Sequence, residues 1–224
     1  MTNLINLKND AEQAMNRMVH GKLCYSNKRE EKILDYKNEI KKEMEESLNV
    51  KKHLISECLK DINKAVEMLI VAIREDKKIY LCGNGGSASD SQHITCELVG
   101  RIRKRDISIP AFSLVSNVST LTALSNDFGY DSIFSKQLAV YAKRGDILIA
   151  ISTSGKSLNV IKAVETAKKL NMRIIVMTGK IETELSEMTD VTIMVPSDDT
   201  PRIQEAHILI GHIFASILER EFGK

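Results

Sequence analysis

Residues 83–87 (GNGGS) form a glycine-rich turn directly after an apolar, strand-like run at 78–82. The polar segment that follows the turn has the pattern of a helix. Backbone N–H groups at such a strand-to-helix turn can bind a phosphate or another anion. A single glycine-rich turn can also be a tight turn and nothing more, so the sequence alone leaves both interpretations open.

His93 and Glu97 lie four residues apart in that helical segment. This spacing places both side chains on one face of the helix, about one turn beyond the glycine-rich turn. An imidazole and a carboxylate beside an anion site indicate a phosphorylated small molecule whose far end meets acid–base or metal chemistry. A lone pair of this spacing is more often a solvated surface pair, but its place near the start of an anion-binding helix favours the functional interpretation.

A second candidate anion site is the hydroxyl-rich segment 152–157 (STSGKS), which follows the strand-like run 146–152 and precedes a helical pattern. Its four hydroxyl groups and the free N–H groups of a helix start predict a phosphate site. Ser157 also suits the N-cap of the helix. The alternative is a helix cap with solvated hydroxyls, but four hydroxyls in six residues exceed what capping requires.

Two known nucleotide-binding motifs do not fit the chain. The P-loop pattern GxxxxGK[ST] requires a glycine where this sequence has Ala150. The glycine-rich turn fits the dinucleotide pattern GxGxxA, but Ser116 and Asn117 stand where that pattern wants an acid after the second strand. These mismatches argue against a P-loop kinase and against a dehydrogenase.

Apolar runs alternate with helical patterns through the second half of the chain, which predicts an α/β fold with a doubly wound parallel sheet flanked by helices. In such folds ligands bind at the carboxyl ends of the strands, where both candidate loops fall. The expected strands are 78–82, 107–115, 146–152, 172–178 and 191–195. The expected helices between them are 157–170 and, with a weaker pattern, 118–125, 131–143 and 181–188.

Long helices are expected at both ends of this region. Residues 35–76 contain hardly a helix breaker and have one apolar stripe, so they form one long helix or two. Residues 201–222 form an amphipathic helix with a favourable proline in its first turn. Pattern alone predicts a polar face for Arg202, Gln204, Glu205 and His207, and a core position for His212.

Composition limits the class of protein. The 224 residues suffice for one sizeable core, and a formal net charge of +2 argues against nucleic acid or a membrane surface as partner. The aromatic content of 4% with no Trp argues against stacking on bases. The four cysteines form no CxxC pair, and no apolar run suits a signal peptide or a membrane span. We therefore expect a cytoplasmic protein with reduced thiols.

Four segments together resemble the sugar isomerase (SIS) fold, which is flavodoxin-like, and within it the phosphoheptose isomerases (sedoheptulose 7-phosphate isomerases). The segments are GNGGSASDSQHITCELVGR at 83–101, ALSNDFGYDSIFSKQ at 123–137, ISTSGKSLNVIKA at 151–163 and TPRIQEAHILIGH at 200–212. The resemblance implies an isomerase domain at 38–224, and residues 1–37 are an N-terminal extension without a counterpart in the family pattern.

The resemblance also implies an activity. It is the interconversion of D-sedoheptulose 7-phosphate and D-glycero-D-manno-heptose 7-phosphate, the first step towards activated heptoses for lipopolysaccharide, capsule or related surface glycans. It implies a homotetramer with active sites at subunit interfaces and one zinc ion per subunit.

Site residues follow from the resemblance position by position. The phosphate would be held by Ser152, Thr153, Ser154 and Ser157. The sugar site would be lined by Asn84, Gly85, Gly86, Asn126 and Asp127. The metal would be surrounded by His93, Glu97, Gln204 and His212, with Glu97 and Gln204 also facing the substrate.

The residue types suit proton transfer through an enediol. We expect Glu97 to move the carbon-bound proton, and His212 to move protons on the oxygens or to open the ring. Zinc could polarise the carbonyl; if it is catalytic, Glu97 acts after partly releasing it, and if it is adventitious, both residues act directly. Gln204 and His212 are ~12 Å apart along a regular helix, so their convergence on one metal needs long reach, an irregular first turn or another subunit.

Two other functions share part of this pattern. One is a non-catalytic SIS tetramer that binds a bacterial replication initiator, whose pattern lacks the carboxylate and the last histidine that this chain has as Glu97 and His212. The other is an isomerase or a sensor of a different sugar phosphate. The combination of His93, Glu97, Gln204 and His212 favours the heptose enzyme.

Overall fold

The computed structural model describes residues 28–100, 103, 106 and 108–223. The chain divides into two compact units, Met1–Glu45 and Glu46–Lys224. Helix α2 (Lys28–Glu57) contributes to both units, and every strand described lies in the second. Residues 1–27 of the predicted N-terminal extension lie outside the described residues, so its boundary and role stay predictions.

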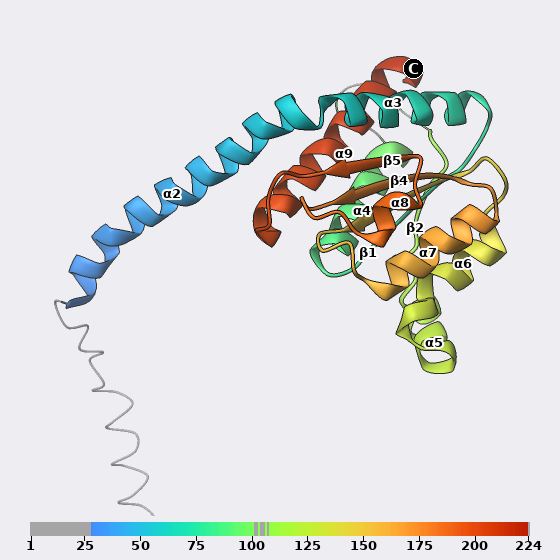
Figure 1. The fold of residues 1–224 in the computed structure, drawn as a ribbon, viewed down its shortest axis with the longest axis horizontal. Coiled ribbons are helices and arrows are strands. Elements are labelled where there is room, and N and C mark those ends of the chain that lie inside the picture. Colours follow the sequence, from blue (N-terminus) through green and yellow to red (C-terminus); the bar gives the residue numbers. More distant parts are fainter. Residues whose placement is uncertain (1–27, 101–102, 104–105, 107, 224) are drawn as a thin grey trace, which may run out of the picture. The chain divides into compact units, whose positions relative to one another are not determined.

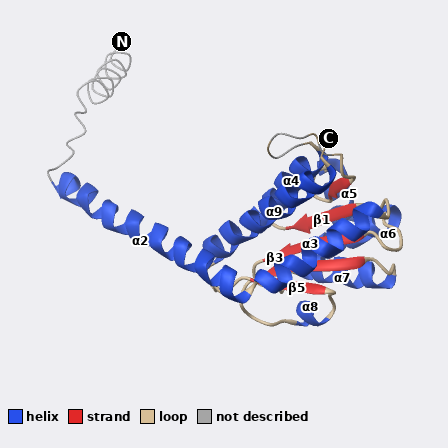
Figure 2. Cartoon of the chain, turned by 90° about the horizontal axis from the view of Figure 1, so that it is seen from above, coloured by secondary structure: helices blue, strands red, loops and turns tan. Residues whose placement is uncertain are grey.

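The second unit contains a five-stranded parallel sheet with the strand order β2-β1-β3-β4-β5, drawn in red in Figure 2. The order reverses between β1 and β3, and in such sheets ligands bind outside the carboxyl ends of the strands at this reversal. The predicted doubly wound α/β fold is therefore confirmed. The strands are β1 (Ile79–Gly83), β2 (Ala111–Ser113), β3 (Ile147–Ser152), β4 (Arg173–Thr178) and β5 (Val191–Met194).

Strand β2 is shorter than the predicted run 107–115. It pairs with β1 alone and so forms an edge of the sheet. The residue before it, Pro110, accepts a hydrogen bond from the backbone N–H of Ile79 but has no N–H of its own to donate. The ladder therefore begins only at Ala111.

Helices cover both faces of the sheet (Figure 1), and the strand side chains alternate between two cores. Ile79 and Leu81 of β1 pack with α3, α4 and α9, whereas Tyr80 and Cys82 pack with α6 and α7. The helices after α2 are α3 (Leu59–Arg74), α4 (Gly86–Val99), α5 (Val118–Phe128), α6 (Ile133–Tyr141), α7 (Leu158–Lys169), α8 (Glu184–Glu187) and α9 (Thr200–Phe222), with a 3-10 turn η1 (Tyr130–Ser132) before α6.

The long helical pattern predicted at 35–76 is two helices, α2 and α3, which meet at Cys58. The Cys58 thiol is buried and donates a hydrogen bond to the Met194 carbonyl at the end of β5 (3.1 Å). Burial, together with the negative charges of Glu57 and Asp61, raises the pKa of this thiol to about 11, so it stays protonated. Cys58, Cys82 and Cys96 are free, as the sequence predicts, and Cys24 lies outside the described residues. Within the described part of the chain, no helix combines the length and apolar character needed to span a bilayer.

The prediction of a core position for His212 is wrong, because its side chain is 42% exposed. The prediction of a polar-face position for His207 is also wrong, because His207 is the buried histidine of α9. The His207 side chain is fully buried among residues that face the sheet, and its Nε2 atom lies 3.3 Å from the Thr178 carbonyl oxygen. Its Nδ1 atom is buried without a hydrogen-bond partner among the described residues. Burial lowers the pKa of His207 to about 4, against a smaller opposite effect of the Thr178 carbonyl.

The depressed pKa of His207 predicts acid-sensitive folding. As the pH falls, His207 is protonated in the unfolded chain at a higher pH than in the folded one. Its effect on the free energy of unfolding is therefore absent above about pH 6.5, grows as the pH drops towards 4, and does not increase further below about pH 4. Relative to a His207→Gln variant, the wild-type protein is expected to lose roughly 3 kcal/mol of unfolding free energy between pH 7 and pH 4. Urea unfolding at several pH values measures this difference.

His53→Gln, at an exposed position of α2, is the matched control and is expected to follow the wild-type curve. Parallel pH curves for wild type and His207→Gln would contradict the assignment.

Candidate active site

The glycine-rich turn joins β1 to α4 and is shaped by its contact with α9. Gly85, at the N-cap of α4, has a φ of 56°, in the left-handed region that glycine adopts readily. A Cβ atom on Gly86 would lie 2.4 Å from Nε2 of Gln204, so only a glycine allows the Gln204 amide to rest against the turn. The structure thus brings together two predicted substrate residues that are 118 positions apart, Gly86 and Gln204.

His93, Glu97 and His212 converge on one point between α4 and α9. Nε2 of His93 lies 3.1 Å from Oε1 of Glu97 and 3.1 Å from Nε2 of His212, and the latter lies 3.3 Å from the same Glu97 oxygen. The two helices can approach this closely because Gly211 faces Ile94, where a Cβ atom would lie 2.4 Å from Cδ1. The predicted partners, far apart in the chain, are therefore neighbours in the fold.

This triangle could hold a metal ion. Its three ligand atoms all lie within 4.8 Å of one another. No placement of protons on the two Nε2 atoms turns all three contacts into hydrogen bonds, because either two lone pairs or two N–H groups then face each other. A cation between three unprotonated ligand atoms would remove this conflict. The Glu97 side chain is 14% exposed, and its Oε2 atom is buried without a hydrogen-bond partner among the described residues. Gln204, at the glycine-rich turn, stays a predicted fourth ligand.

Asp90 belongs to the same region and was missed in the sequence. It lies on α4 one turn before His93, and its Oδ2 atom is buried without a hydrogen-bond partner among the described residues. Burial raises the pKa of Asp90 to about 6, and the nearby imidazoles of His93 and His212 oppose this rise. The spacings of three and seven residues before His93 and Glu97 were a signal for this position, since both place Asp90 on their face of the helix.

The serine loop, residues 152–157, joins β3 to α7 and lies beside the glycine-rich turn because β3 pairs with β1. Ser152 is buried and its hydroxyl donates to Oγ of Ser157 (3.3 Å), whereas the exposed Ser154 accepts the backbone N–H of Lys156 (3.2 Å). Ser157 occupies the N-cap of α7 as predicted, but its side chain makes no capping hydrogen bond in the described part of the chain. Capping therefore does not account for these hydroxyls.

Asn84 connects the glycine-rich turn to two other segments. Its side-chain amide exchanges two hydrogen bonds with the amide of Asn159, in the first turn of α7, at 2.8 and 2.9 Å. Its Oδ1 atom also accepts the Tyr130 hydroxyl (2.8 Å). Asn126 and Asp127, the predicted sugar residues just before Tyr130, are exposed and hydrogen-bonded to each other (3.0 Å). Asn159 was not predicted as a site residue.

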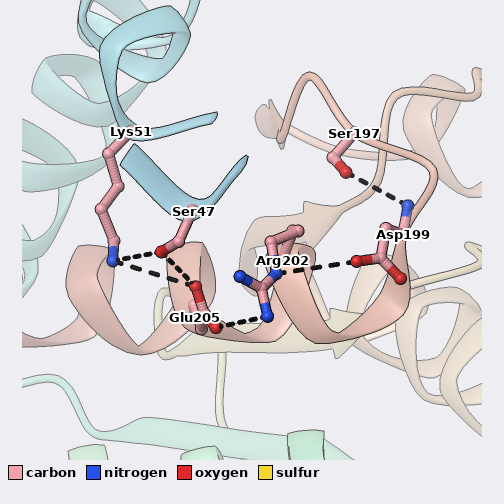
Figure 3. Close-up of polar contacts among 6 residues, drawn as sticks. All are labelled: Ser47, Lys51, Ser197, Asp199, Arg202 and Glu205. Carbon is pink, nitrogen blue, oxygen red and sulfur yellow. Dashed lines mark hydrogen bonds and ion pairs between the residues drawn. The ribbon is translucent and has the colours of Figure 1, made fainter. Parts of the chain in front are cut away.

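The first turn of α9 is held by a chain of charged contacts (Figure 3). Nη2 of Arg202 lies 3.1 Å from Oε1 of Glu205, and its Nε atom lies 3.6 Å from Oδ2 of Asp199. Ser47 donates a hydrogen bond to Glu205, and Lys51 donates one to Ser47 (2.8 Å). The Arg202 side chain is only 11% exposed, and a cation at the start of a helix is unfavourable by itself. The flanking carboxylates compensate for it and fix this turn.

A cavity of about 430 Å³ lies elsewhere, between β1, β2 and α6. It is lined by apolar and aromatic side chains such as Tyr80, Phe112 and Val140 together with uncharged polar side chains and Lys78, and it contains none of the predicted site residues. It has no carboxylate or imidazole among its lining residues. We therefore place the candidate active site at the loops of the β1–β3 reversal and along the adjoining helices α4 and α9, between which the acid–base groups converge.

Comparison with known proteins agrees with this geometry. The SIS domain family profile matches residues 36–179. The fold and the two loops at the β1–β3 reversal thus define a SIS domain protein.

Sequence relatives identify the family within the SIS domain proteins. A phosphoheptose isomerase from Sulfurimonas denitrificans is 45% identical over 190 residues, which cover 84% of this chain and 97% of that protein. The enzyme of the same name from Clostridium acetobutylicum is 43% identical over 191 residues, with coverage of 84% and 97%. The solved structure of phosphoheptose isomerase GmhA from Neisseria gonorrhoeae has a TM-score of 0.78 at 36% identity, covering 83% of this chain and 99% of that one. The chain belongs to the phosphoheptose isomerase family. The resemblance seen in four sequence segments is confirmed, and the comparisons do not support the replication-initiator alternative.

Proposed function

We propose that this chain interconverts D-sedoheptulose 7-phosphate and D-glycero-D-manno-heptose 7-phosphate. The observation that carries the proposal is the convergence of His93, Glu97 and His212 between α9 and α4, the helix that begins at the glycine-rich turn, in a chain of the phosphoheptose isomerase family. Such an aldose–ketose isomerase must remove a proton alpha to a carbonyl, form an enediol, and return the proton to the neighbouring carbon.

Glu97 is the proposed base for the carbon-bound proton. Its carboxylate is largely shielded from solvent, and its buried Oε2 atom has no hydrogen-bond partner among the described residues, so no hydrogen bond within that part of the chain competes for this oxygen. His212, which is 42% exposed and 3.3 Å from Glu97, is the proposed group for proton transfer on the sugar oxygens or for ring opening. Both residues face one point, as transfer between adjacent carbon and oxygen atoms requires.

The serine loop is the proposed phosphate site and the glycine-rich turn the proposed sugar site. Ser152, Thr153, Ser154 and Ser157 would donate hydroxyl hydrogen bonds to phosphate oxygens, next to the amino end of α7, whose dipole favours an anion. Asn84, Gly85, Gly86, Asn126 and Asp127 would line the sugar, and Gln204 would also face it. The phosphate anchor then follows β3, whereas the acid–base groups lie on α4, which follows the adjacent strand β1, and on α9.

Zinc is the proposed metal, one per subunit. His93, Glu97, Gln204 and His212 would hold it. Ligands about 2.0–2.1 Å from a tetrahedral zinc stand roughly 3.3 Å apart. The spacing of the triangle, 3.1 to 3.3 Å, supports this choice. When bound, zinc supplies positive charge that stabilises negative charge on the substrate oxygens.

The active protein is proposed to be a cytoplasmic homotetramer with active sites at subunit interfaces, supplying heptose for surface glycans. Helix α5, next to the predicted sugar residues, supports a subunit contact: none of its residues is buried, and Val118 and Phe128 are 69% and 54% exposed. Apolar side chains of this kind are common in interfaces.

Glu97→Gln and His212→Gln are each expected to abolish isomerisation without changing the oligomer. Each variant keeps the size of the side chain and removes a proton-transfer group. The assay incubates purified protein with sedoheptulose 7-phosphate and follows aldose formation by NMR, while gel filtration reports the oligomer. Glu67→Gln and His53→Gln, at exposed positions of α3 and α2, are matched controls. Near-normal turnover in either test variant would show that the residue has no essential part in the mechanism. An inactive wild type would refute the proposal that sedoheptulose 7-phosphate is the substrate.

Ser154→Ala is expected to raise KM with little change in kcat. The variant loses one charge-assisted hydrogen bond to phosphate, which contributes about 1.5–3 kcal/mol to binding. Ser56→Ala is the control, because Ser56 is exposed and donates only to its own helix. An effect confined to kcat would contradict the phosphate assignment.

His93→Ala is expected to lose zinc. After removal of metal with a chelator and reloading, elemental analysis should find about one zinc per chain in the wild type and far less in the variant. His53→Ala is the control. Equal zinc content in His93→Ala and wild type, or none in both, would contradict the proposed site.

A further inference from the structure

Three segments proposed to contact substrate meet at one part-buried amide pair. Asn84 lies in the glycine-rich turn, Asn159 lies two residues after the serine loop, and Tyr130 follows the segment with Asn126 and Asp127. Asn84 and Asn159 are 75 residues apart, and the Tyr130 hydroxyl reaches Asn84 across 46 residues. Three hydrogen bonds thus join parts of the chain that no local turn connects.

The hydrogen bonds of this pair form a closed ring. Nδ2 of Asn84 donates to Oδ1 of Asn159 (2.8 Å), and Nδ2 of Asn159 donates to Oδ1 of Asn84 (2.9 Å). The reciprocal pair fixes the orientation of each amide relative to the other, because reversing one of them alone places like groups opposite each other. With the Tyr130 hydroxyl on the second lone pair, Oδ1 of Asn84 is saturated as an acceptor.

Because Asn159 is buried, losing the amide of Asn84 as its partner would be costly. Asn159 is 2% exposed, so an unpaired amide at this position would lack water as a substitute partner. The apolar neighbours of Asn159 in α7, Val160 and Ala163, already anchor the helix to the sheet. The amide adds a defined distance between the start of α7 and the glycine-rich turn, which apolar packing alone does not specify.

This distance matters if the proposed function is correct. The substrate is then gripped at its phosphate by the serine loop and must present its carbonyl end to Glu97, on the helix that begins at the glycine-rich turn. A displacement of one loop against the other by about 1 Å is enough to lower turnover strongly. The amide pair spans the two loops.

We propose that Asn159 is a positioning residue for the isomerisation: its reciprocal amide pair with Asn84, steadied by Tyr130, sets the spacing between the phosphate anchor and the acid–base groups. Asn159 acts through the loops and touches no reacting atom. The inference rests on the proposed function, because the spacing has this consequence only for a substrate held at both ends.

The test compares Asn159→Leu and Tyr130→Phe with wild type. Leu has nearly the shape of Asn without its hydrogen bonds, and Tyr130→Phe removes one hydroxyl from a ring that is 56% exposed, so this second variant folds even if the first does not. Asn159→Leu is expected to lower kcat roughly 10–100-fold and Tyr130→Phe several-fold. The inhibition constant of inorganic phosphate, which needs the serine loop alone, should stay within about threefold of wild type in both.

Two controls separate positioning from stability. Circular dichroism identifies an assay temperature at which each variant is fully folded, and a positioning defect persists there whereas a purely structural one disappears. Tyr141→Phe, on an exposed tyrosine of α6, should behave as wild type.

Unchanged kcat in both variants, or a defect that vanishes once the protein is fully folded, would overturn the inference while wild-type activity still supports the proposed function. An inactive wild type would refute the proposed function instead.

Discussion

The site depends on how closely α9 approaches α4. At Gly211 the two helices come so near that a single Cβ atom would overlap Ile94. This contact brings His212 within 3.3 Å of Glu97, although the two residues are 115 positions apart in the chain. The charged contacts around Arg202 hold the amino end of the same helix, where Gln204 rests against Gly86. The catalytic groups are therefore positioned by helix packing, and the loops supply the surroundings.

The sequence predicted the fold well because the central strands β1, β3 and β4 are buried on both faces and leave apolar runs. The strands β1, β3, β4 and β5 lie where these runs predict them. Their alternation with helices indicated the fold class, and the two polar loops at strand ends indicated a ligand site at the carboxyl ends of the strands. The prediction erred where backbone chemistry overrode the pattern, as in β2, which is limited by Pro110.

The site was harder to predict because it depends on which way single side chains point. Periodicity alone predicted the reverse of the observed environments of the two histidines of α9. His207 faces the sheet and is buried, whereas His212 faces α4. The resemblance to a family corrected this, since it assigned His212 by motif. Asn159 had no local signal, because its importance comes from an amide 75 residues away that only the folded chain brings within reach.

The buried neutral His207 has a consequence for enzymology in mild acid. Proton uptake by this side chain shifts the balance between folded and unfolded protein in the same pH interval that contains the raised pKa of Asp90, about 6, in the candidate active site. The fall in enzyme activity at low pH then has two causes, which are unfolding of part of the protein and a change in the protonation state of the active-site groups. Dividing each velocity by the folded fraction at that acidity separates the two, and only the corrected curve reports on chemistry.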